Sequence, residues 1–409
     1  ASGTKYVPQE LMDTWEKKDP VTNFQQYLLE HGILTEEQDA QFRKAIKKEI
    51  NEHLKIANAE EPISSTVEEE LNDVYAPFQF TEIKPTSAKK EIRLIDAISE
   101  GLGQSLEKYE DLVIMGQDIA DYGGVFKITE GFVEQFGKDR IRNTPICESG
   151  IVAAAMGLSI NNMKAVVEMQ FGDFVSSGFN PIVNYLAKVN YRWNQNADVV
   201  VRMPCGAGVG AGPFHSQTNE AWFTKTPGLK VVYPAFPQDA KGLLTASIED
   251  PNPVLFFEHK ALYRSIRQDV SEDYFTIPLG KAAHLREGNS VSIITYGAGV
   301  HWALDHLASN EEIDADVIDL RTLQPLDEEA IFNSVKRTGK VLLLQEDSMF
   351  GGIMSDISAL IAEHCFEDLD APIKRVASLP TPIPFAANLE EKYLAKHRLA
   401  TSLEELLAY

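Results

Sequence analysis

Residues 143–174, with the sequence NTPICESGIVAAAMGLSINNMKAVVEMQFGDF, contain the features that decide the fold class. A proline turn leads into a run of small and apolar residues at 151–160, which favours a tightly packed helix. The apolar run at 164–168 is short enough to be a strand buried on both faces. A helix that leads into a buried strand is typical of a parallel sheet, so we expect an α/β protein.

Glu148 lies between the proline turn and this helix, where backbones approach closely and water is scarce. Burying a carboxyl group is unfavourable unless something donates a hydrogen bond to it or it has a proton-transfer role. Two interpretations are open on the local sequence. Glu148 is either a first-turn acid that satisfies free backbone amides or a functional carboxyl group.

The same alternation of apolar runs and helical patterns continues on both sides of this stretch. In the middle region it predicts strands at 112–116, 164–168, 198–202, 230–233 and 254–257, and helices at 91–108, 151–161, 179–191 and 238–248. A smaller unit repeats it, with strands predicted at 289–297, 317–320, 340–345 and 373–377. We therefore expect two parallel-sheet domains, at 89–265 and 285–409, joined by a linker at 266–284. The Glu346-Asp347 pair is predicted to be a solvated turn.

Residues 1–88 have a different pattern, that of helices with one apolar face. An Asp-Pro pair at 19–20 and a capping box, TEEQ, at 35–38 predict helices at 21–30 and from 36 onward. The second helix carries an apolar stripe at four-residue spacing, made of Phe42, Ile46, Ile50 and Leu54. Such helices cannot form a core alone, so we expect this segment to lie against another body. Residues 60–90 are predicted to be an extended linker.

Composition excludes several classes of protein. The 409 residues carry a net charge of −23, which argues against a nucleic-acid surface because phosphate backbones need clustered Lys and Arg. Three widely spaced cysteines argue against a disulfide framework or a thiolate metal site, and they favour the cytoplasm. The longest apolar run is about half of what a membrane span needs, so no membrane association is expected.

The predicted carboxyl ends of two strands carry the informative polar residues, at the edge where ligands collect in such sheets. Gln170 to Phe174 follow one strand, and a glycine-rich loop that carries His215 follows the next. Its glycines alternate every second residue and meet neither phosphate-loop pattern, so a nucleotide site is weakly supported and a mobile or closely approached loop fits better. For His215 and Phe174 the alternatives of a structural residue and a site residue stay open.

Many short motifs in one order make the chain resemble the beta subunit of the thiamine-diphosphate-dependent 2-oxo acid dehydrogenases, most of all the branched-chain member. They include Asn143-Thr-Pro-Ile-Cys-Glu148, Glu168-Met-Gln-Phe-Gly-Asp-Phe174, His215-Ser-Gln217, Pro227-Gly-Leu-Lys-Val-Val232, Asp250-Pro-Asn-Pro253 and Leu262-Tyr-Arg264. The resemblance runs from about residue 91 to the C-terminus. The N-terminal segment is similar to the tail of the same enzymes' alpha subunit, through Trp15-Glu-Lys-Lys-Asp-Pro20 and Tyr27-Leu-Leu-Glu-His-Gly32. This order implies the later part of a fused alpha-beta polypeptide.

The resemblance implies a transketolase-like pyrimidine-binding domain, a transketolase C-terminal-like domain and specific roles for four residues. Glu148 would face the pyrimidine ring nitrogen of thiamine diphosphate and share a proton with it, and Phe174 would lie against the ring face. His215 would stabilise charge or carry a proton during acyl transfer, and Gln170 would line the acyl pocket. A structural potassium site, largely of backbone oxygens, would be formed at Ala197, Val199, Val200, Ser247, Asp250 and Asn252.

One part of the family's pattern is missing from this sequence. The family holds the cofactor's diphosphate and magnesium with a Gly-Asp-Gly motif of the alpha subunit, and the sequence contains no Gly-Asp-Gly. The resemblance therefore implies half of a site, which an alpha-type half must complete. The implied partners are that half, a lipoyl-bearing acyltransferase and a second copy of the chain as a homodimer. The implied substrate is a branched-chain 2-oxo acid, with pyruvate as the alternative substrate. The alternative function is that of a non-catalytic assembly module.

Overall fold

The computed structural model describes residues 5–86 and 88–409, which divide after Val67 into two compact units. Among these residues, no helix combines the length and the apolar character needed to cross a bilayer. The first unit contains three helices, α1 (Gln9–Glu16), α2 (Pro20–Glu30) and α3 (Glu36–Ala59).

Both predicted helix starts in the first unit are confirmed. The Asp19 side chain accepts a hydrogen bond from the Thr22 amide at 2.7 Å, and Thr35 and Gln38 form a complete capping box. The apolar stripe predicted on the second helix is exposed along α3. The predicted linker at 60–90 contains one short helix, α4 (Val67–Asn72), and ends in a strand.

The second unit contains a seven-stranded sheet whose strand order is β12-β6-β7-β5-β4-β2-β3. The strands are β2 (Leu112–Gly116), β3 (Ile141–Asn143), β4 (Lys164–Glu168), β5 (Val199–Cys205), β6 (Lys230–Val232), β7 (Val254–His259) and β12 (Thr322–Gln324). All neighbours are parallel except β12, which runs antiparallel to β6. The predicted parallel sheet is therefore confirmed.

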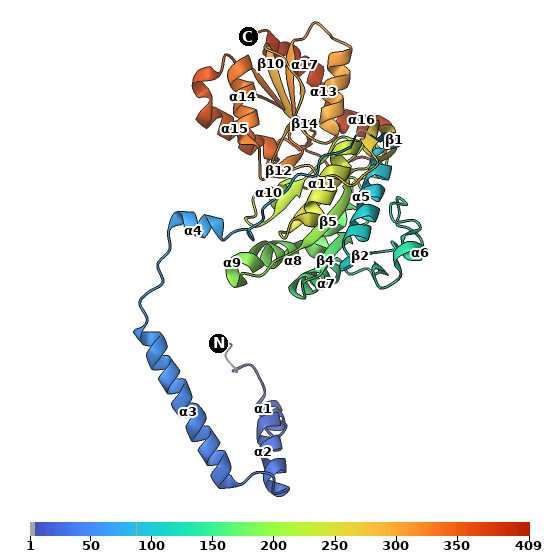
Figure 1. The fold of residues 1–409 in the computed structure, drawn as a ribbon. Helices are drawn as coiled ribbons and strands as arrows, with labels where there is room; N and C mark the ends of the chain where they lie inside the picture. Colours follow the sequence, from blue (N-terminus) through green and yellow to red (C-terminus); the bar gives the residue numbers. More distant parts are fainter. Residues whose placement is uncertain (1–4, 87) are drawn as a thin grey trace. The chain divides into compact units, whose positions relative to one another are not determined.

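Continuous apolar runs form these strands because both faces of the sheet are covered. Val166 and Val200 face the helices α5 (Leu94–Lys108) and α11 (Pro237–Glu249), which lie side by side (Figure 1). Val167 and Val201 face the other way, toward α7 (Glu148–Ile160) and α8 (Phe179–Asn184). Successive side chains of a strand point to opposite faces, so one apolar run serves two cores.

Two predicted helices in this unit differ from the observed ones. The predicted helix at 91–108 begins only at Leu94, because residues before it form β1 (Lys89–Arg93), paired with β8 (Arg267–Ser271) in a two-stranded antiparallel ribbon. The predicted helix at 179–191 is broken into α8, η2 (Leu186–Lys188) and α9 (Val189–Trp193). Shorter elements connect the strands, namely α6 (Phe132–Phe136), η1 (Gly172–Gly178), α10 (Ala221–Thr224) and α12 (Leu262–Ser265).

A second sheet of five strands follows, in the order β14-β13-β10-β11-β9. Its strands are β9 (Ala283–Arg286), β10 (Val291–Thr295), β11 (Ala315–Asp319), β13 (Val341–Ser348) and β14 (Lys374–Ser378), and only β9 is antiparallel to its neighbour. Helices accompany it, namely α13 (Ala298–Ala308), α14 (Glu328–Thr338), α15 (Ile353–His364), η3 (Phe366–Asp368), α16 (Ala387–Tyr393) and α17 (Lys396–Leu407). The strand β12 leaves this region to pair with β6, and one apolar core continues from the α7 face into the second sheet.

Candidate functional site

The candidate residues gather at one edge of the seven-stranded sheet. Gln117 follows β2, Glu148 is the first residue of α7, Gln170 and Phe174 follow β4, and the glycine-rich loop at 206–218 follows β5. These elements are adjacent because the strand order contains β5-β4-β2-β3, and the carboxyl ends of parallel strands share one edge. The edge expected from the sequence is therefore the one that carries the candidate residues.

Glu148 is buried, with 8% of its surface exposed. Gln117 Nε2 donates to its Oε1 at 3.1 Å, and among the described residues no other donor reaches this carboxyl group. Its backbone lies against the end of η1, since a Cβ on Gly178 would stand 3.5 Å from the Glu148 carbonyl oxygen. Glu148 lies in the first turn of α7, but no hydrogen bond from the helix amides to its side chain is found among the described residues.

An aromatic cluster surrounds the candidate histidine. The His215 ring centroid is 4.7 Å from that of Phe171 and 5.6 Å from that of Phe174, both edge to face. Phe126 continues the cluster at 5.7 Å from Phe171, and the Lys260 ammonium lies 5.9 Å from the Phe171 centroid. Burial lowers the pKa of Lys260, whose Nζ donates to the Gly206 carbonyl oxygen at 2.8 Å. The structure thus brings His215 and Phe174 together at the end of η1 opposite to the one that meets Glu148.

Gln170 is half-buried beside the same cluster. Its Nε2 donates to Asp118 Oδ2 at 3.1 Å, and Asp118 has a left-handed backbone with φ of 58°. Asp173, which the sequence did not single out, is more deeply buried. Its Oδ1 accepts from the Gln217 amide at 3.2 Å and from Gln217 Nε2 at 2.8 Å, while its buried Oδ2 has no hydrogen-bond partner in the part of the chain that the structure describes. Asp173 therefore anchors the chain two residues beyond His215.

The Glu346-Asp347 pair is not the solvated turn that the sequence predicts. Glu346 is buried in β13, where its Oε1 accepts from the Ala207 amide at 2.7 Å and its Oε2 lies 2.6 Å from His259 Nε2. Burial acts to raise the pKa of Glu346, but His259, the Ala207 amide and Lys260 together hold that pKa below its ordinary value. This acid belongs to the second sheet yet contacts the glycine-rich loop of the first.

Comparison with known proteins finds matches along most of the chain. Residues 90–265 match "Transketolase, pyrimidine binding domain", residues 280–398 match "Transketolase, C-terminal domain", and residues 2–65 match "Dehydrogenase E1 component". The beta subunit of 2-oxoisovalerate dehydrogenase from Bacillus subtilis is 44% identical over 321 residues, which cover 77% of this chain and 98% of the relative. The chain belongs to the beta subunits of the thiamine-diphosphate-dependent 2-oxo acid dehydrogenase first component, E1.

Other relatives of this E1 beta chain are similar at nearly the same level. Two more from Bacillus subtilis are an acetoin:2,6-dichlorophenolindophenol oxidoreductase beta subunit, 42% identical over 74% of this chain and 93% of the relative, and a pyruvate dehydrogenase E1 beta subunit, 41% identical over 75% and 96%. A solved "Split gene transketolase, inactive beta4 tetramer" covers 78% of this chain and 99% of its own, with a TM-score of 0.64 and 22% identity. That likeness confirms the fold.

The E1 beta chain has residues that fit the pyrimidine end of thiamine diphosphate, which the family uses. Glu148 offers a buried carboxyl group, and Phe174 and His215 offer rings at the same sheet edge. Among the described residues, no group of three or more His, Cys, Asp or Glu side chains could hold a metal ion.

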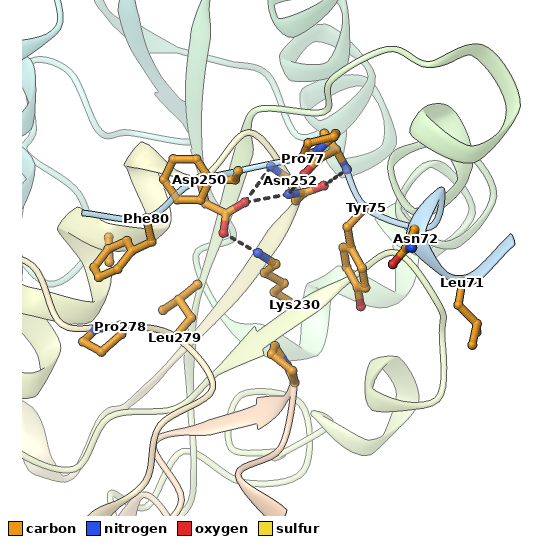
Figure 2. Close-up of a pocket in the computed structure, with 14 residues that line it drawn as sticks. Leu71, Asn72, Tyr75, Pro77, Phe80, Lys230, Asp250, Asn252, Pro278 and Leu279 are labelled. Carbon is orange, nitrogen blue, oxygen red and sulfur yellow. Dashed lines mark hydrogen bonds and ion pairs between the residues drawn. The ribbon is translucent and has the colours of Figure 1, made fainter. Parts of the chain in front are cut away.

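The six positions predicted for potassium lie at the opposite, amino edge of the sheet. Two of them line a cavity of about 450 Å³ beside residues 71–80 (Figure 2). Their side chains are already engaged: Asp250 accepts from the Lys230 ammonium and from Asn252, whose Oδ1 accepts from the Ala76 amide at 2.7 Å. The Ser247 hydroxyl donates to the Leu243 carbonyl oxygen at 2.7 Å. A potassium ion at these positions stays a prediction.

Proposed function

We propose that this E1 beta chain acts in the oxidative decarboxylation of branched-chain 2-oxo acids, with transfer of the acyl group to a lipoyl acceptor. Two observations support the proposal: Glu148 is buried with a hydrogen bond from Gln117, and His215 contacts Phe174 at the same edge of the sheet. Bound thiamine diphosphate would supply the carbon nucleophile and the electron sink for decarboxylation. We also propose that residues 89–265 provide the pyrimidine-binding domain and residues 285–409 the C-terminal domain.

In this proposal each site residue has one task. Glu148 exchanges a proton at the pyrimidine ring nitrogen, where exclusion of water strengthens its effect. Phe174 packs against the ring face, and Gln170 lines the pocket for the acyl chain. His215 stabilises charge or carries a proton at the acyl group as it leaves for the dithiolane.

The proposed partners follow from what this chain lacks and from its relatives. An alpha-type half would hold the diphosphate and magnesium, a lipoyl-bearing acyltransferase would accept the product, and two copies of the chain would pair as a dimer. The match of residues 2–65 to a dehydrogenase E1 component supports a link to alpha-type sequence. Three free cysteines support a cytoplasmic location, where thiols stay reduced.

Substrate preference tests the branched-chain assignment. We expect the enzyme assembled with its alpha-type half to use 3-methyl-2-oxobutanoate with a kcat/KM at least about tenfold above that for pyruvate, because methyl groups in an apolar pocket are worth about 1–3 kcal/mol. The measurement is steady-state kinetics with both acids and with acetoin. A preference for pyruvate would favour the pyruvate dehydrogenase alternative, which a relative of 41% identity supports.

Cofactor affinity tests the proposal that this chain holds only half of the thiamine diphosphate site. We expect this chain alone, with magnesium, to bind thiamine diphosphate with a Kd weaker than about 100 μM, because charge-assisted contacts to the diphosphate supply much of the affinity. Titration calorimetry measures it, and addition of the alpha-type half should restore tight binding. Micromolar binding by the chain alone would contradict the half-site.

A further inference from the structure

The glycine-rich loop before His215 has an unusual regular backbone. Gly206, Gly208, Gly210 and Gly212 have φ values of +87°, +86°, +70° and +71°, which only glycine adopts readily. Left-handed residues that alternate with ordinary ones turn successive N–H groups toward one side and form a concave site for an anion. The loop at 206–212 does not match a phosphate-loop sequence pattern, but its backbone has the form of an anion-binding site.

The anion in this concavity is a carboxylate of the protein itself. Glu390 in α16, only 4% exposed, accepts from the Gly208 amide on Oε1 at 2.8 Å and from the Gly210 amide on Oε2 at 3.0 Å. Glu346 accepts from the amide of Ala207, the residue before Gly208, at 2.7 Å. Hydrogen bonds to a buried carboxylate are stronger than neutral ones, so both acids hold the loop firmly.

Both carboxylates come from the region of the second sheet, whereas His215 belongs to a loop of the first. The Phe385 ring also rests on the loop, because a Cβ on Gly212 would stand 2.3 Å from its Cε1. Beyond His215, Asp173 holds the Gln217 amide at 3.2 Å. His215 therefore sits between two anchored points, one set by the C-terminal region and one by η1.

We propose that Glu390, supported by Glu346, is a positioning residue that holds His215 against Phe171 and Phe174. It touches neither ring and acts only through the backbone of residues 207–212. In this way the C-terminal region, which carries no reacting group of its own, controls the geometry of the site. The proposal rests on the role proposed for His215.

Glu390→Gln tests the contact with almost no change in volume. The amide oxygen can accept one backbone N–H, but the amide nitrogen cannot accept the other, so one of the two glycine amides loses its partner. In the full chain we expect hydrogen exchange of amides 207–212 to become about tenfold faster or more. Glu391→Gln is the matched control, since Glu391 is the next residue, is exposed, and lies 3.6 Å from His397. Unchanged hydrogen exchange in Glu390→Gln would show that Glu390 does not hold the glycine-rich loop.

Kinetics of the assembled enzyme test the positioning role. We expect Glu390→Gln to lower kcat about tenfold with little change in KM for the 2-oxo acid, because a misplaced histidine affects the reacting state more than binding. Normal kcat together with faster exchange would overturn positioning. His215→Ala separates this idea from the proposed function. Normal turnover in His215→Ala would remove the role proposed for His215. Lost turnover in His215→Ala together with normal turnover in Glu390→Gln would overturn only the positioning role of Glu390.

Gly210→Ala gives an independent route if Glu390→Gln fails to fold. A Cβ at Gly210 meets no atom within 4 Å, so the substitution strains only the left-handed backbone that presents the amide. Gly131→Ala is its control, because Gly131 also has a positive φ and open space but lies in another loop. Lowered kcat in Gly210→Ala alone supports the proposal, and equal effects in both variants would overturn it.

Discussion

Replacing Glu148 with Gln is expected to lower turnover by the assembled enzyme about 10³-fold while the fold stays intact. The amide has nearly the volume of the carboxyl group, and it can still accept the 3.1 Å hydrogen bond from Gln117 through its oxygen. What it cannot do is exchange a proton with a ring nitrogen. The loss should therefore appear in kcat, measured with saturating 2-oxo acid and cofactor, and hardly in the thermal midpoint.

The control for this substitution is Glu130→Gln, at an exposed acid that lies 3.9 Å from the Lys127 ammonium. It should leave kcat unchanged, because exposed pairs contribute little. If Glu148→Gln kept turnover within about tenfold of the parent, the acid would have no proton-transfer role. The chain would then fit the alternative of an assembly module that docks partners without completing a site.

The sheets could be predicted from the sequence because their signal is local. Val166-Val167 and Val200-Val201 are apolar on both faces, and only a covered parallel strand accounts for such runs. The helix predicted at 179–191 is interrupted at Tyr185, and Pro181 does not explain the break, because a proline in the first turn of a helix is tolerated. The strand β12 left no comparable signal, because three residues pairing at a sheet edge are too few for a periodic pattern.

The surroundings of the candidate site were harder to predict. Gln117 meets Glu148 across 31 residues, and Glu390 meets Gly208 across 182, so no spacing in the sequence marks either pair. In the sequence, Glu346 beside Asp347 is typical of a solvated turn. In the folded chain, His259 and the Ala207 amide contact Glu346. Residue type indicated which groups could do chemistry, whereas the groups that hold them depend on long-range packing.

Arg202→Met is expected to lower the free energy of unfolding by about 3–5 kcal/mol. Arg202 is fully buried in β5, where its Nε and Nη2 donate to both oxygens of Glu258 at 2.7 and 2.8 Å and its Nη1 donates to Glu168 at 2.8 Å. Burial raises the pKa of Glu168, and Arg202 opposes that shift. Without the guanidinium, two carboxyl groups stay buried with no positive charge between them. Urea denaturation measures the loss, and Arg267→Met, at an exposed arginine 3.7 Å from Glu91, should cost less than about 1 kcal/mol.

A double variant separates the cost of a broken pair from the net contribution of the pair. Arg202→Met with Glu258→Gln removes one charge of each sign, and Tyr263, whose hydroxyl donates to Glu258 at 2.7 Å, can still donate to the new amide. We expect the double variant to be more stable than Arg202→Met alone, because an uncompensated charge costs more than the intact pair contributes. If the losses in free energy of unfolding from the two single substitutions simply added, Arg202 and Glu258 would have no interaction energy.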